Sequence, residues 1–381
     1  MENVLSAKEK IYLDNAATTF LSKEVAMVMN RSNIEFIGNP SSIHSFGRLS
    51  RAQIELARKS VAACINADPS EIVFTSGGTE ANNAALLMSI RDLNITRVIT
   101  SKIEHYAVLK PLDNFSEKIR VDYVNIDKEG NIDLNHLTEL LNTKEKTLVS
   151  LMHVNNEIGT CAPIHTIANI CESNKAFFHS DTVQSIPYYD IDIKKLKIDF
   201  LSCSAHKFHG PKGCGFLFIK KGLDVTPFVS GGNQERGLRG GTENISGICG
   251  LNEGLSNAKI EQNKNFKYLS DLKIYFLQKL DTKKLVYSIN GNLQNSTPAI
   301  VNVSFETKKD VSMFLFNIDL AGIAISGGSA CTSGNNKGSH VLKEIGVSMN
   351  STAIRVSFSK YTTKKDIDTL LNVLEKLLSD D

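Results

Sequence analysis

The sequence predicts an α/β fold, in which a mostly parallel sheet with flanking helices is joined to a smaller α+β domain. From about residue 47 to residue 220, short apolar runs typical of strands alternate with segments whose apolar residues recur every three or four positions, as in helices. Such alternation is typical of a parallel sheet covered by helices. Beyond about residue 260 the order of elements changes. We therefore expect residues 15–260 to form a large domain, and residues 1–14 and 261–381 a small one.

The large domain is predicted from strand-like runs and the helical segments between them. A helix with the apolar stripe Ile54, Ala57, Val61 and Ile65 comes first. The strand-like runs cover residues 71–75, 97–100, 121–126, 147–154, 176–179, 198–202 and 214–219, and the helical segments include 79–90, 133–141 and 164–173. Because ligands of such sheets bind outside the carboxyl ends of the strands, we expect the functional site there.

The small domain is predicted from two helix patterns and two strands. Leu269, Leu272, Phe276 and Leu280 form one helix stripe, and residues 364–378 form the second helix pattern. Residues 301–305 and 354–358 alternate between apolar and polar side chains, which is typical of half-buried strands. A glycine- and serine-rich loop, residues 326–338, lies between these strands.

Composition excludes several classes of protein. The 381 residues are 41% hydrophobic and 22% charged, as in ordinary globular proteins, and a net charge of +2 gives no footprint for nucleic acid. The first ten residues contain no apolar region typical of a secretory signal, and the apolar stretch 84–90 is too short to span a membrane. Seven irregularly spaced cysteines without a CxxC pair argue against disulfides or zinc. We expect a cytoplasmic protein without membrane contact.

Lys207 follows the strand-like run 198–202, within a segment of small and polar residues. A lysine at the end of a strand can be desolvated enough to form a Schiff base with a carbonyl cofactor. Ser204 and His206 beside it are donors suited to a phosphate group. The alternative is a basic surface loop between two strands. No carboxylate or thiolate is spaced to complete a metal site with His206 and His209, so we expect no metal.

Three further segments supply parts that a phosphorylated pyridine aldehyde requires. Gly77, Gly78 and Thr79 follow a strand and open a helix, where free N–H groups bind phosphate; the alternative is an ordinary capping box. Asp181 ends another strand, where its carboxylate could pair with a pyridinium nitrogen; the alternative is that it is a helix N-cap. His105 can stack on a ring and move protons, although a lone histidine is more often structural.

Two residues of the small domain have open interpretations. Cys331 is either a small buried side chain or, because glycine, serine and asparagine surround it, a reactive thiolate on an exposed, mobile loop. Arg355 lies on the polar side of an alternating strand. It either faces solvent or binds a carboxylate through its two-pronged guanidinium group.

Several motifs in the same order resemble those of one known family. They are residues 12–19, 38–42, 75–80, 153–159, 181–184, 204–207, 239–244 and 329–333. On these segments the chain resembles, over nearly its full length, the cysteine desulfurases of the NifS/IscS group. These belong to the class V aminotransferase superfamily of pyridoxal 5′-phosphate (PLP) enzymes of fold type I. The loop around Cys331 resembles the longer form found in this group.

The resemblance implies a role for each candidate residue. Lys207 would bind PLP, Asp181 would pair with its pyridine nitrogen, and His105 would stack on its ring. Asn156 and Gln184 would contact the side of the ring that carries the phenolic oxygen. The phosphate would be held by Gly78, Thr79, Ser204 and His206, and by Thr242 of a second subunit, which implies a homodimer.

The resemblance also implies the activity, a PLP-dependent sulfurtransferase reaction. L-Cysteine would become L-alanine, with Lys207 removing the Cα proton, Arg355 and Asn156 binding the substrate, and His105 returning a proton. Cys331 would take the sulfur as a persulfide and pass it to acceptor proteins, such as an iron–sulfur scaffold, for iron–sulfur cluster assembly or tRNA thiolation. The alternatives are a selenocysteine lyase, an aminotransferase on the same scaffold, and a non-catalytic assembly subunit.

Overall fold

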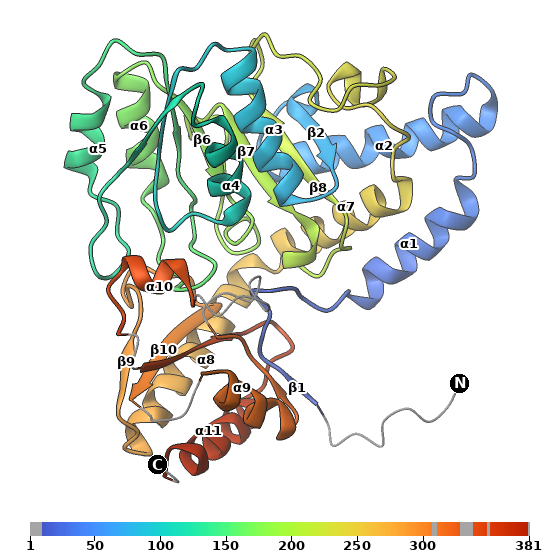
Figure 1. Ribbon diagram of the computed structural model, residues 1–381. Coiled ribbons are helices and arrows are strands. Elements are labelled where there is room, and N and C mark those ends of the chain that lie inside the picture. The colour runs from blue at the N-terminus through green and yellow to red at the C-terminus, as the bar shows by residue number, and fades with distance from the viewer. Residues whose placement is uncertain (1–9, 307–310, 328–337, 349–350, 380–381) are drawn as a thin grey trace.

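The computed structural model describes residues 10–306, 311–327, 338–348 and 351–379, and Figure 1 shows two parts joined by long connections. The larger part is built on a sheet of seven strands in the order β2-β8-β7-β6-β5-β3-β4. These are β2 (Ile72–Thr75), β3 (Arg97–Thr100), β4 (Arg120–Tyr123), β5 (Thr147–Ser150), β6 (Phe177–Asp181), β7 (Phe200–Ser204) and β8 (Gly215–Ile219). β8 is antiparallel to both of its neighbours, and the remaining pairs are parallel. The predicted, mostly parallel α/β architecture is confirmed.

Helices cover both faces of this sheet, because side chains of its strands point alternately to two apolar cores. On β8, Phe216 and Phe218 belong to one core, and Leu217 and Ile219 to the other. The first core is completed by α2 (Ser45–Cys64), α5 (Leu134–Leu141), α6 (Ile164–Ser173) and α7 (Ile245–Ile260). The second is completed by α3 (Gly78–Arg91) and α4 (Tyr106–Phe115). Helix α1 (Lys23–Glu35) packs along α7.

The smaller part contains an antiparallel sheet in the order β12-β10-β9. Its strands are β9 (Tyr287–Ile289), β10 (Ile300–Glu306) and β12 (Ser351–Ser357), and its helices are α8 (Gln262–Thr282), α9 (Val311–Leu320) and α11 (Lys364–Ser379). The predicted stripe on α8 is fully buried in this core, which also contains Leu13. β1 (Ile11–Tyr12) pairs in parallel with β11 (Ile323–Ala324). The domain boundaries at residues 14/15 and 260/261 stay a prediction.

The prediction of half-buried strands in the small part was wrong. Residues 300–305 of β10 and 352–357 of β12 are buried on both faces. The polar face of β12 is covered by the chain that follows β1, since Asn15 Nδ2 donates to Ser357 O at 2.8 Å and Ala16 N donates to Ser357 Oγ at 2.8 Å. Within the described residues, no helix combines the length and the apolar character needed to cross a membrane.

Short connecting elements complete the chain, and one of them carries the candidates His206 and Lys207. They are the 3₁₀ turns η1 (Pro69–Glu71), η2 (Ala205–Lys207) and η3 (Gln234–Gly237), and the short helix α10 (His340–Glu344). Figure 1 shows α10 at the junction of the two parts, beneath the sheet of the larger one. Four predicted strands of the larger sheet end elsewhere: the runs 121–126 and 147–154 leave the strand after Tyr123 and Ser150, whereas β6 and β7 each continue two residues further, to Asp181 and Ser204.

Candidate active site

A cavity of about 550 Å³ opens at the carboxyl ends of β6 and β7, where the sequence predicts the site. It is lined by parts of the larger sheet, by the chain after β1 and by β12. Ten of the candidate residues line it: Gly78, Thr79, His105, Asn156, Asp181, Gln184, Ser204, His206, Lys207 and Arg355. Residues far apart in the sequence therefore meet in one place.

Lys207 ends the turn η2, which begins directly after β7. Its Nζ donates hydrogen bonds to the carbonyl oxygens of Ala16, at 2.5 Å, and Ala17, at 2.8 Å. The alternative of a basic surface loop does not describe this side chain, which is partly buried and points into the cavity wall. The lysine is thus held at a strand end by the segment that links the two parts.

Asp181 is the last residue of β6, and only 6% of it is exposed. Asn82 Nδ2 donates to its Oδ2 at 2.6 Å, and the backbone N–H of Val183 donates to its Oδ1 at 3.0 Å. The carboxylate is therefore fixed on two sides within the cavity. It closes a local turn and caps no helix, so the N-cap alternative was wrong.

The start of α3 lacks the capping box that was the alternative interpretation. Gly77 is the N-cap and makes no side-chain capping hydrogen bond. The Glu80 carboxylate accepts instead from Ser76 N at 2.9 Å and pairs with Arg239 at 3.0 Å. A Cβ on Gly78 would lie 2.7 Å from Val183 Cγ2, so glycine is required by close packing here. The positive end of this helix is exposed to the cavity.

His105 is the N-cap of α4, and its Nδ1 accepts a hydrogen bond from Ala107 N at 3.0 Å. Since an N–H donates to Nδ1, the neutral ring carries its proton on Nε2. Burial lowers the pKa of His105. The Asp181 carboxylate partly offsets this lowering, whereas Lys207 and His340 add to it. The structure thus shows a capping role for His105 and leaves Nε2 as a donor.

Two further candidates contact the chain after β1. Gln184 Nε2 donates to Ala16 O at 2.8 Å, and His206 Nδ1 lies 3.1 Å from Thr18 Oγ1. Burial, reinforced by neighbouring lysines, lowers the pKa of His206 to about 4, so this imidazole is neutral at physiological pH. A neutral imidazole has one N–H donor, and it is left for a ligand when Nδ1 accepts from the Thr18 hydroxyl.

Arg355 is buried, with 2% of it exposed, so the solvent-facing alternative was wrong. It donates to Asp14 Oδ1 at 2.7 Å and to the carbonyl oxygen of Asn156 at 2.9 Å. Its Nε is buried and has no hydrogen-bond partner among the described residues. A buried donor of this kind is costly unless a ligand satisfies it.

One predicted residue of the described chain is not brought to the cavity. Thr242 is exposed and does not line it, as expected for a residue that would act on a second subunit. Cys331 lies outside the residues that the structure describes.

The sequence reasoning missed four polar residues at or beside the cavity. Asn82 holds Asp181, and its place one turn after Gly78 on α3 could have indicated this. Glu157 and His340 line the cavity, and Glu104 lies behind it. Burial raises the pKa of Glu104 well above its usual range and raises that of Glu157 to about 7.

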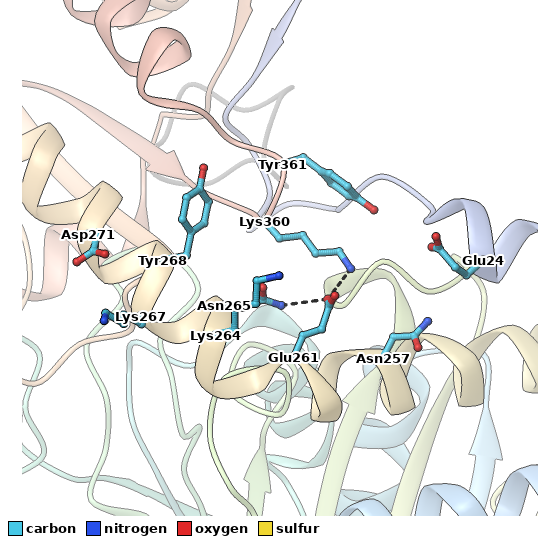
Figure 2. A pocket seen from close by; sticks show the side chains of 10 residues that line it. All are labelled: Glu24, Asn257, Glu261, Lys264, Asn265, Lys267, Tyr268, Asp271, Lys360 and Tyr361. Carbon is cyan, nitrogen blue, oxygen red and sulfur yellow. Dashed lines mark hydrogen bonds and ion pairs between the residues drawn. The ribbon is translucent and has the colours of Figure 1, made fainter.

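A second hollow, of about 670 Å³, lies between α8 and the chain near residue 360 (Figure 2). Both signs of charge line it, and Lys360 Nζ donates to Glu261 Oε2 at 2.7 Å within it. It contains none of the candidate residues, so the predicted chemistry is not located there.

The fold and the cavity are those of a PLP-dependent enzyme of the aminotransferase type, and comparison with known proteins agrees. The sequence profile of the class-V aminotransferase family matches residues 11–370 of this chain. The cysteine desulfurase IscS of Dictyoglomus turgidum is 42% identical, over 97% of this chain and 95% of that protein. The chain therefore belongs to the cysteine desulfurases, and its cofactor is PLP.

Solved structures show the same relationship. A NifS-like protein superimposes with a TM-score of 0.90 and 35% identity, covering 98% of this chain and all of that one. A structure described as SspA in complex with cysteine superimposes with a TM-score of 0.81 and 33% identity, covering 93% of this chain and 100% of the other.

Proposed function

We propose that this chain converts L-cysteine to L-alanine and transfers the sulfur, as a persulfide on Cys331, to acceptor proteins. The observation that carries the proposal is the meeting of Lys207, Asp181 and Arg355 in one cavity. An amine, a buried carboxylate and a buried guanidinium group are the groups needed for a pyridine aldehyde and an amino acid. The family relationship supports the same reaction.

The residues present fit PLP. Lys207 would bind its aldehyde carbon, and Asp181, held by Asn82 and Val183 N, would pair with its pyridine nitrogen. When bound, PLP supplies an electron sink that makes the Cα proton of an attached amino acid acidic. Gln184 Nε2 has a second N–H besides the one given to Ala16, so it can donate to the phenolic oxygen; Asn156 would assist there.

The phosphate would lie at the start of α3. The uncapped N–H groups of Gly78 and Thr79 and the positive helix end favour an anion. Ser204 and the neutral His206 would add donors from the end of β7. Thr242 of a partner subunit would complete the set.

The substrate carboxylate would bind Arg355, assisted by Asn156. The unpaired Nε of Arg355 supports this role, because a carboxylate can accept from Nε and from a terminal nitrogen together. Asp14 and Asn156 O hold the guanidinium group in place from the other side.

In the proposed reaction each of these side chains has one task. The Lys207 amine would accept the Cα proton, and His105, whose Nδ1 is engaged by Ala107 N, would donate a proton from Nε2. The Cys331 thiolate attacks the substrate sulfur. An S–S bond forms between Cys331 and the substrate sulfur while the C–S bond of the substrate breaks. The electron pair of the C–S bond stays on carbon, which takes up a proton to give alanine.

Purified protein supplied with PLP and L-cysteine tests this proposal. We expect L-alanine to be released without any oxo acid, and Lys207→Ala to abolish both this release and the absorption band of lysine-bound cofactor. A requirement for an oxo acid would identify an aminotransferase instead. Turnover of selenocysteine but not of cysteine would identify a selenocysteine lyase, and a colourless protein without turnover would indicate a non-catalytic subunit.

A homodimer is part of this proposal. Large apolar side chains stay exposed on α1, on α2 and on the chain that flanks and joins them: Phe20, Leu21, Met27, Ile34, Ile37, Ile43, Phe46, Leu49 and Leu56. Apolar side chains gathered in this way are typical of a protein interface. A partner subunit on this surface could bring its Thr242 to the cavity.

We also propose a cytoplasmic location and sulfur acceptors of the iron–sulfur scaffold or tRNA-thiolation type. The six cysteines that the structure describes are all free, which suits a reducing compartment. Incubating the persulfide-loaded enzyme with candidate acceptors and measuring transferred sulfur would identify the acceptor.

A further inference from the structure

His340, the first residue of α10, lines the cavity beside Tyr106. Its Nε2 lies 2.9 Å from the carbonyl oxygen of Glu104. Because a carbonyl oxygen only accepts hydrogen bonds, Nε2 must carry a proton. The ring also stacks on Tyr106, with 4.4 Å between ring centroids, so its orientation is fixed on two sides.

The other ring nitrogen of His340, Nδ1, is buried and carries a lone pair that accepts no hydrogen bond from the described residues. The other two histidines of the cavity differ, since Nδ1 of His105 accepts from Ala107 N and Nδ1 of His206 contacts Thr18 Oγ1. Burial lowers the pKa of His340, so the ring is neutral and the lone pair is available at neutral pH.

Helix α10 holds His340 in a fixed relation to Arg355. The Ser339 hydroxyl donates to Glu157 Oε2 at 2.5 Å, and it accepts from Leu342 N at 3.1 Å as the N-cap of α10. Asn156, the residue before Glu157, accepts from Arg355 through its carbonyl oxygen. The guanidinium group and the imidazole are therefore linked through two adjacent residues of one loop.

Apolar packing fixes α10 against the same loops. Val341, Leu342 and Ile345 form a small core with Ile103 and Ile158. Ile103 lies just before His105 in the chain, and Ile158 directly follows Glu157. The junction position of α10 in Figure 1 is the result of this packing. The imidazole is thus supported by hydrogen bonds, ring stacking and an apolar core.

We propose that His340 Nδ1 accepts the thiol proton of the substrate L-cysteine. This inference rests on the proposed function, in which Lys207 and the cofactor take the amino group and Arg355 takes the carboxylate. The thiol is the one remaining polar group of cysteine, and it is a hydrogen-bond donor that needs an acceptor. Other acidic groups of the cavity are engaged: Asp181 by Asn82, Glu80 by Arg239, and Glu157 by Ser339.

The proton transfer is balanced within the site. The S–H bond breaks, an Nδ1–H bond forms, and the electron pair stays on sulfur. The resulting imidazolium keeps its Nε2–H bond to Glu104 O, so both ring protons have acceptors. A lost general base costs roughly a hundredfold or more in rate.

His340→Gln tests the proposal in the PLP-loaded enzyme. The amide nitrogen of glutamine can replace Nε2 as donor to Glu104 O, but glutamine has no acceptor at the position of Nδ1. We expect kcat/KM for L-cysteine to fall about a hundredfold, and the affinity for L-alanine, measured by the change in cofactor absorption, to stay within about twofold. His340→Asn, whose amide oxygen lies nearer the position of Nδ1 but is too weak a base to take a thiol proton, should show the same loss.

His136→Gln is the matched control, because the His136 ring also makes a hydrogen bond to the backbone, its Nδ1 accepting from Asn125 N at 3.0 Å, but outside the cavity. It should leave both values unchanged. Unaltered kcat/KM in both His340 variants, or an equal loss of L-alanine and L-cysteine affinity, would overturn the inference. If the unmodified enzyme released no alanine from cysteine, the proposed function would fail with it.

Discussion

At the residue scale, His105 combines two functions that a substitution can separate. Its Nδ1 caps α4, and its Nε2–H is left for chemistry. We predict that His105→Asn keeps the helix, because asparagine is a good N-cap, yet lowers alanine formation by roughly a hundredfold to ten-thousandfold as a proton donor is lost. His105→Ala should in addition lower the free energy of unfolding by about 1 kcal/mol. Alanine assays and denaturation curves of both variants check this, and equal stability of the two would contradict the capping role.

Glu157 is predicted to make stability depend on pH. Burial raises its pKa in the folded chain from 4.5 to about 7, whereas in the unfolded chain it is ordinary. Between these two pKa values the folded state therefore binds more protons than the unfolded state. The free energy of unfolding falls as pH rises from about 4.5 to 7. The loss is on the order of 2 kcal/mol.

Glu157→Gln isolates this effect, since the amide resembles the protonated carboxyl and can still accept from Ser339. We expect the fall in the free energy of unfolding over this pH range to be smaller in the variant. Chemical denaturation at a series of pH values measures it. Parallel curves for the two proteins would show that Glu157 does not titrate in this range.

The residues that the sequence predicts well are those whose local context is sufficient. Lys207 and Asp181 were found because strand ends are visible in the apolar pattern, and a parallel sheet brings strand ends together. His340 and Glu104 were missed, because their contact joins residues 236 positions apart. The burial of Arg355 was missed for the same reason, since its partner Asp14 is 341 positions away.

At the scale of elements, several helices that bury an apolar stripe were predicted, whereas α1, which leaves apolar side chains exposed, was not. Helix α6 matches its predicted range, and α3 and α11 match within one residue at each end. Helix α1 was not predicted: its only buried residues are Val25 and Ser32, while Met27 and Ile34 are exposed. The apolar residues of α1 therefore lie on more than one face, and they do not repeat as a single helical stripe.

The start of α3 is the element on which we expect phosphate binding to depend most. In Gly78→Ala, the added Cβ would lie 2.7 Å from Val183 Cγ2, so helix or turn must shift. Overpacking of this kind costs about 1–3 kcal/mol, and we predict weaker PLP binding in fluorescence titrations. Gly78→Ala with Val183→Ala should recover PLP affinity, because the clashing methyl group is removed. Failure of the double variant to recover would locate the defect elsewhere.

At the scale of the whole molecule, the exposed apolar surface on α1 and α2 and the position of Thr242 lead to one prediction. Glu243, next to Thr242, pairs with Arg51 of α2 at 2.8 Å, so the Thr242 loop is attached to the helix that carries part of this surface. A dimer formed there would order the partner's phosphate contact as well as bury the apolar side chains. Dimerisation and PLP affinity should therefore change together.

Ile43→Glu tests this coupling, because Ile43 is 91% exposed in the single chain. Replacing an isoleucine that becomes buried by a carboxylate loses roughly 3 kcal/mol per subunit, and the dimer contains the change twice, so its dissociation constant should rise at least about a hundredfold. Val286→Glu is the control, since Val286 is 79% exposed but directly precedes β9 in the smaller part. We expect sedimentation to show a dimer for the unmodified protein and for the control, and dissociation with weaker PLP binding for Ile43→Glu. A monomeric unmodified protein that binds PLP fully would exclude a shared active site, and Thr242 would then have no role in holding the phosphate.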